Sequence, residues 1–168
     1  MKTDLLSELE DSRLAFHALL NSLSDDDMQK VSHSPPWTNK QIFFHMLFGY
    51  FLLPSLIVIV LLFGRLPQRF SKLFANLLNS GVRPFNAINS LGPRGGGRVF
   101  TRGGLKKTYE IVYRVIVRLL RMLPEDELRR GMHYPTQWDP LFCDYMTLTE
   151  IFRFPMRHFY FHVSHITR

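Results

Sequence analysis

Apolar residues recur at steps of three, four and seven along much of the chain, which is the spacing of one face of an α-helix. The first such segment covers residues 3–23, and residues 105–123 repeat the pattern with basic side chains mostly opposite. Two capping boxes, residues 38–41 and 147–150, pair a threonine with a Gln or Glu three positions later, and each begins a further helix. The pattern predicts an all-α protein.

The middle of the chain is more ambiguous. Residues 46–63 form an uncharged run of 18, long enough for a membrane span. Pro54 in its centre favours two consecutive buried helical pieces broken at that residue instead. Residues 67–79 follow as a basic amphipathic helix, which could cover the run, dimerise through it or rest on a membrane surface.

Residues 79–104 are rich in Gly, Pro and Asn and predict a long surface loop. Glycines next to arginines can hold a phosphate, but no P-loop or dinucleotide-binding pattern is present. Residues 131–140 show little periodicity and are expected to cross to the last helix as a loop.

Composition narrows the class of protein. The chain has 168 residues, 46% of them apolar, so residues 1–168 are expected to form one domain with a substantial core. The net charge of +7 is spread along the chain without a nucleic-acid-binding motif, and nucleic-acid binding is therefore not expected. The first residues lack the pattern of a secretion signal, which favours a cytoplasmic location, with membrane association as the alternative.

The single cysteine, Cys143, excludes an internal disulfide framework and a multi-cysteine zinc module. It has no nucleophile signature around it, and we expect it to be buried and inert.

Histidines are the residues most suggestive of chemistry. His158 and His162 lie four positions apart on one face of the last predicted helix, where one ion could reach both imidazoles. His165 lies near the same stripe, and His45 lies among apolar residues of the second predicted helix. Phe159 stands where a zinc protease H-E-x-x-H motif has its glutamate, which excludes that class. From the residues alone, a metal site and a set of hydrogen-bonded core histidines both remain open.

Two other histidines have simpler interpretations. His17 adjoins the apolar stripe of the first helix, and His133 lies in the stretch of low periodicity. We expect the first to be a boundary or core residue and the second a surface residue, with no ligand role for either.

Several motifs resemble a known family. Residues 37–46 (WTNKQIFFHM) resemble the Trp-Thr/Ser…His helix start of the DinB-like (DinB/YfiT) superfamily. Residues 139–148 together with His158 and His162 resemble its closing helix, and residues 119–128 are similar to the end of its third helix.

This resemblance implies a four-helix bundle with up-down-down-up connectivity, commonly a homodimer. It implies a divalent ion, zinc or nickel, held by His45, His158 and His162, with an open position for water or a thiolate. Relatives include metal-dependent thiol S-transferases and thiol-dependent isomerases. Residues 54–104 depart from the usual compact pattern, and we expect an apolar and amphipathic helical insertion followed by the Gly-rich loop.

Two residues near the implied ligands, His165 and Tyr160, could support the metal site without being among its three main ligands. His165 falls where relatives often carry a glutamine, and it could be an outer contact of the metal site or an additional ligand. Tyr160, or His165, could assist proton transfer. The sequence thus predicts a divalent-metal-binding protein, a thiol transferase or hydrolase-like enzyme acting on a small electrophile. One alternative is a non-catalytic metal-binding or stress-related dimer. Another is a membrane-associated protein anchored through residues 46–78.

Overall fold

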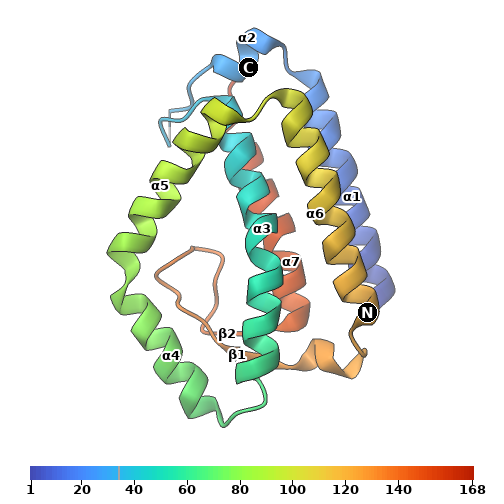
Figure 1. Cartoon of the computed structure of the whole chain (residues 1–168), viewed down its shortest axis with the longest axis vertical. Coiled ribbons are helices and arrows are strands. Elements are labelled where there is room, and N and C mark those ends of the chain that lie inside the picture. Colours follow the sequence, from blue (N-terminus) through green and yellow to red (C-terminus); the bar gives the residue numbers. More distant parts are fainter. Residues whose placement is uncertain (34) are drawn as a thin grey trace.

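Helices make up most of the chain in the computed structural model, which describes residues 1–33 and 35–168 (Figure 1). The helices are α1 (Lys2–Ser22), α2 (Asp25–Gln29), α3 (Asn39–Phe63), α4 (Gln68–Ser80), α5 (Val82–Val99), α6 (Arg102–Met122), the 3-10 helix η1 (Asp126–Arg129) and α7 (Leu148–Val163). Two short strands, β1 (Gly131–His133) and β2 (Tyr145–Thr147), pair antiparallel.

Four long helices form the bundle. In Figure 1, α1 and α7 run upward while α3 and α6 run downward, which confirms the predicted up-down-down-up four-helix bundle. Helices α6 and α7 each pack against both α1 and α3, so α1 and α3 occupy opposite corners. The core between them is rich in aromatic rings, and Phe16 stacks on Tyr109 with ring centroids 4.2 Å apart.

Both predicted capping boxes are confirmed. The Thr38 hydroxyl accepts a hydrogen bond from the Gln41 amide (3.3 Å), and the Gln41 side chain accepts one from the Thr38 amide (2.9 Å). Thr147 and Glu150 make the same exchange at the start of α7. Because they satisfy amides that no helical carbonyl can reach, they fix where α3 and α7 begin.

The expected break at Pro54 is wrong, because α3 continues through this residue to Phe63. A proline in a helix removes one backbone hydrogen bond, and packing against α5, α6 and α7 outweighs that loss. Among the described residues, α3 is the one helix long and apolar enough to cross a membrane, and 39% of its most apolar 18-residue window is buried. Its contacts with α5, α6 and α7 bury part of this apolar surface, while Phe51, Val58 and Leu62 remain exposed.

The long loop expected over residues 79–104 is also wrong, because most of this stretch is helix α5. Two of its glycines, Gly96 and Gly97, allow close packing against α3. A Cβ atom on Gly97 would lie 2.5 Å from Cγ and 3.2 Å from Cα of Gln41, and one on Gly96 would overlap the Phe44 ring. Glycine therefore lets the two helices approach at these positions, at the expense of intrinsic helix propensity.

This packing predicts opposite effects for two neighbouring substitutions. Gly97→Ala is expected to destabilise the protein by about 1–3 kcal/mol, because the new methyl group meets the α3 backbone. Gly95→Ala adds the same methyl group to exposed α5 surface with nothing within 4 Å, and should stabilise the protein by about 1 kcal/mol. Urea unfolding of both variants measures the difference, and equal effects would contradict the role assigned to Gly97.

Helices α4 and α5 return the chain from the bottom of α3 to the top of α6 (Figure 1). Since α3 and α6 both run downward, the connectivity requires a return of this length. We call α4 and α5 together the crossover arm. The loop between β1 and β2 lies in the opening between this arm and α3, where the Trp138 indole donates a hydrogen bond to the Leu78 carbonyl (2.7 Å).

Ser24 caps the short helix α2 and exchanges capping hydrogen bonds with Asp27. One smaller expectation also fails. Cys143, expected to be buried, is exposed on the loop between the strands. The strand pair itself was not predicted, because segments of three residues show too little alternation to be recognised.

Candidate metal centre

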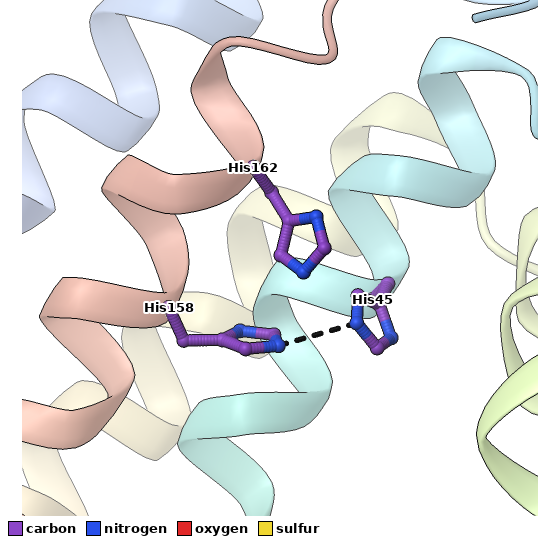
Figure 2. Close-up of side chains that lie close together, drawn as sticks. All are labelled: His45, His158 and His162. Carbon is purple, nitrogen blue, oxygen red and sulfur yellow. Dashed lines mark hydrogen bonds between the residues drawn. The ribbon is translucent and has the colours of Figure 1, made fainter. Parts of the chain in front are cut away.

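Two helices of the bundle bring three histidines together. His45 lies on α3, nearly two turns after the Thr38 cap, and His158 and His162 lie one turn apart on α7. Figure 2 shows the three imidazoles pointing toward one another across the contact between these helices. One nitrogen from each ring can be chosen so that all three lie within 4.8 Å of one another. The structure thus assembles the three residues that the sequence resemblance implies as ligands.

The cluster is buried and its geometry is compatible with one ion. The exposed fractions of His45, His158 and His162 are 4%, 4% and 7%. The Nε2 atoms of His45 and His158 lie 3.2 Å apart. Two imidazole nitrogens on a tetrahedral zinc ion, at 2.0–2.1 Å from the metal, would be about 3.3 Å apart. This pair therefore needs little movement to share an ion.

Burial keeps the three imidazoles neutral. Loss of solvent lowers the pKa of His45 from 6.5 to about 4 and that of His162 to about 3, and it lowers the pKa of His158 as well. The neighbouring histidines lower these pKa values further, since two imidazolium ions would repel each other. Neutral imidazoles are the form that binds metal, so protons do not compete for the site at pH 7.

Contacts within the protein leave part of this cluster without hydrogen-bond partners. The Nδ1 atoms of His45 and His158 are buried and have no partner among the described residues. A Cβ atom on Gly49 would lie 2.8 Å from Nδ1 of His158, so glycine at this position makes room for the ring beside α3. An ion held by the two Nε2 atoms would leave the proton of each ring on Nδ1, so these two buried N–H groups have no acceptor among the described residues.

The two residues given secondary roles behave differently. Nδ1 of His165 lies 3.0 Å from Nδ1 of His162, so His165 contacts a cluster member and can fix the orientation of its ring. Tyr160 is 53% exposed and lies with Glu8, Arg153 and Arg157 in a separate surface depression. The structure does not bring Tyr160 to the histidine cluster.

The other histidines discussed above lie away from the cluster and pair with carboxylates. Nε2 of His17 lies 2.7 Å from a Glu110 oxygen, and Nδ1 of His133 lies 3.1 Å from an Asp144 oxygen. Neither ring lies in the cluster formed by His45, His158 and His162.

Two adjoining hollows give access to the cluster. The inner cavity, of about 170 Å³, is lined by residues of α3, the crossover arm, the β1–β2 loop and α7. The outer pocket, of about 150 Å³, is lined by all three histidines together with Trp37 and Phe161. Five residues line both hollows and form a neck between them: His45, Asn89, Trp138, Asp139 and His158.

Asp139 and Asn89 are functional candidates that sequence reasoning missed. Burial raises the pKa of the Asp139 carboxyl, although one of its oxygens accepts a hydrogen bond from the Leu141 amide (2.8 Å). Asp139 comes from the β1–β2 loop and Asn89 from α5, so only the tertiary fold brings them to the neck. Their local sequence carries no signal for this placement.

The arrangement is chemically suited to a bound divalent ion. Three neutral imidazoles can hold a metal, and none of the described residues in the cluster adds a thiolate or carboxylate. The outer pocket leaves space beside the rings for a water molecule or a substrate group. A carboxyl with a raised pKa at the neck could exchange protons with such a group.

Comparisons with known proteins bear on the fold. The sequence matches no protein-family model, and no curated protein matches it significantly. A solved structure described as "YfiT from Bacillus subtilis is a probable metal-dependent hydrolase with an unusual four-helix bundle topology" superimposes with a TM-score of 0.63 at 14% sequence identity. The match covers 98% of this chain and 83% of that chain. The similarity to the DinB-like superfamily indicated by the sequence is therefore confirmed as a likeness of fold, and this chain has the four-helix-bundle fold of YfiT.

Proposed function

We propose that this protein binds one zinc or nickel ion through His45, His158 and His162 and hydrolyses a small electrophile such as an ester or amide. The observation that carries the proposal is a buried cluster of three neutral histidines beside an apolar cavity. Three imidazoles with an open position are a ligand set of catalytic zinc sites. The solved structure of similar fold is itself described as a probable metal-dependent hydrolase.

The metal would supply a bound water with a pKa near 7 and an electropositive contact for the substrate carbonyl. Asp139 would accept a proton from the attacking water and pass it to the leaving group, since its raised pKa is closer to neutrality than that of an exposed aspartate. The amide of Asn89 would donate a hydrogen bond to the substrate at the neck. Water provides the hydroxyl that joins the carbonyl carbon and the proton that leaves with the alcohol or amine.

Hydrolysis is favoured over thiol transfer by the charge of the two hollows. Neither the inner cavity nor the outer pocket is lined by Lys or Arg within the described part of the chain. Low-molecular-weight thiols that carry carboxylates would lack a cationic partner there, whereas water needs none. Thiol transfer is therefore the less favoured activity of this site.

We expect the protein reconstituted with zinc to hydrolyse members of a panel of neutral aryl esters and anilides, and the metal-free protein to be inactive. Asp139→Asn keeps the acceptor for the Leu141 amide but removes the proton acceptor, so it should lower kcat by about 100-fold or more. Its zinc content, measured by elemental analysis, should stay at one ion per chain.

Asp144→Asn is the matched control, because Asp144 lies on the same loop but is exposed and pairs with His133. It should keep both zinc and activity. One zinc ion per chain without hydrolysis of any substrate would favour the non-catalytic alternative, and full activity in Asp139→Asn would exclude that residue from proton transfer.

Assembly and location are part of the same proposal. We propose a cytoplasmic homodimer, with membrane attachment through residues 46–78 as the alternative. Helix α4 offers a surface for either, because Leu73 and Leu77 are exposed there and Arg69 and Lys72 lie on the same helix. An apolar strip bordered by basic residues suits a second copy of the chain or an anionic lipid surface.

A further inference from the structure

The inner cavity differs in chemistry from the metal centre that it adjoins. Apart from the neck residues, its walls are almost wholly apolar, with Leu52 and Leu56 from α3, Phe74 from α4, Phe85 from α5, and Phe142 and Phe154 from the far side. No Lys, Arg or Glu side chain lines it among the described residues. A charged or strongly hydrated group placed there would lose its water without gaining a partner.

The volume of the cavity limits what can fill it. An apolar cavity of about 150 Å³ in another protein stays dry and takes up benzene. At about 170 Å³, the inner cavity has room for one six-membered ring or a branched aliphatic group of similar size.

Trp138 is part of the wall of the inner cavity and also lines the outer pocket beside the three histidines. Its indole stacks on Phe85 with ring centroids 4.2 Å apart and is hydrogen-bonded to the Leu78 carbonyl. These contacts join the β1–β2 loop to both helices of the crossover arm, so the wall is braced on two sides. A ligand whose body fills the inner cavity would therefore extend its remaining part through the neck, beside His45 and His158.

From this geometry we infer that the inner cavity binds the body of the substrate, and that the substrate is a neutral molecule with a single aromatic ring or compact branched aliphatic group next to its reactive bond. The inference rests on the proposed function for the reactive end of the molecule. The body of the substrate would contact only the apolar walls of the inner cavity, where no proposed metal ligand lies outside the neck.

The test uses inert probes and metal-free protein, so that it depends neither on metal binding nor on catalysis. The probes are benzyl alcohol, which is neutral, and benzoate, which has a similar size and a negative charge. Trp138 reports binding by its fluorescence in a Trp37→Phe background, which removes the other tryptophan. We expect saturable binding of benzyl alcohol at one site and at least tenfold weaker binding of benzoate.

A pair of substitutions on α3 locates the site. Leu52→Phe fills the inner cavity and should weaken benzyl alcohol binding at least tenfold. Leu62→Phe makes the same change at an exposed position of the same helix and should leave binding unaltered. Circular dichroism melts of both variants establish that they fold. Should Leu52→Phe unfold the protein, Leu56→Phe fills the cavity from the next turn of α3.

The outcomes separate this inference from the proposed function. Absence of benzyl alcohol binding, equal binding of benzoate, or unchanged binding in a folded cavity-filled variant would overturn the assignment of the cavity, whatever the metal content. Probe binding that follows the expected pattern, in a protein that takes up zinc but hydrolyses nothing, would support the cavity and overturn the proposed hydrolase activity.

Discussion

Zinc is expected to raise the melting temperature of the metal-free protein by about 5–10 °C at a concentration of about 100 times its dissociation constant, and His158→Ala is expected to abolish this rise. Binding to the folded state alone contributes about 2.7 kcal/mol at that concentration, and each kcal/mol shifts the melting temperature of a chain of this size by about 2–4 °C. His158 is the most suitable position to change, because its Nε2 lies 3.2 Å from that of His45 and its neighbour on α7 completes the cluster.

Differential scanning fluorimetry, with zinc and with EDTA, measures the effect. The readout is the difference between the two conditions, so any loss of baseline stability in the variant does not matter. His133→Ala is the matched control, since His133 pairs with Asp144 outside the cluster. If His158→Ala keeps the full zinc response, the cluster is not the binding site; if the parent protein shows no response to zinc or to nickel, it does not bind these metals.

The metal-free protein is expected to lose stability as the pH falls from 6.5 toward 4. His45 and His162 have folded-state pKa values of about 4 and about 3, below the ordinary value of 6.5, because burial disfavours the charged ring. In this interval the unfolded chain binds protons that the folded protein does not, so acidification favours unfolding. The stability that depends on these groups is complete above pH 6.5 and declines until their folded pKa values are reached.

The expected size of the loss is at most about 3 kcal/mol for His45 by pH 4, because each pKa unit corresponds to about 1.4 kcal/mol. The coupled rings do not contribute additively. Urea unfolding in EDTA at pH 7, 5.5 and 4.5 measures how the free energy of unfolding changes with pH. Carboxylates act at lower pH: Arg13 and Tyr113 lower the pKa of Glu10 from 4.5 to about 2, so its contribution is lost below pH 4.5.

The double variant His45→Gln/His162→Gln tests the assignment of this loss. It keeps polar side chains at both positions but cannot take up protons in this range, so its stability should depend less on pH between 6.5 and 4.5. The change in free energy of unfolding with pH is compared within each protein, so a lower overall stability of the variant does not affect the comparison. A parent protein whose stability is constant over the interval would contradict the burial of neutral histidines.

Local chemistry explains why much of the fold could be predicted. The capping boxes at Thr38 and Thr147 set the starts of two bundle helices through hydrogen bonds that span three residues, and such signals are visible in the sequence. The histidine spacing on α7 is equally local. The third member, His45, lies more than a hundred residues away, and only the family resemblance connected it to the other two.

The failures involve contacts between distant segments. The glycines of α5 have poor helix propensity, yet they lie in a helix, and at Gly96 and Gly97 the side chains of Phe44 and Gln41 on α3 leave no room for a Cβ atom. Pro54 would interrupt an isolated helix but is held in α3 by packing on three neighbours. Asp139 lines the same hollows as His45 and His158 because the β1–β2 loop folds back between α3 and the crossover arm, and this path cannot be predicted from the residues around Asp139 in the sequence.

The up-down-down-up connectivity separates two tasks that many binding sites combine. The three histidines come from α3 and α7, whereas α4, α5 and the β1–β2 loop supply the outer wall of the inner cavity. Substitutions in the crossover arm can therefore reshape the space for a ligand while leaving the imidazoles in place. A variant library confined to residues 68–99 that leaves Asn89 unchanged would vary the shape of the inner cavity without altering any of the three histidines, and the arm is in this sense the adaptable part of the scaffold.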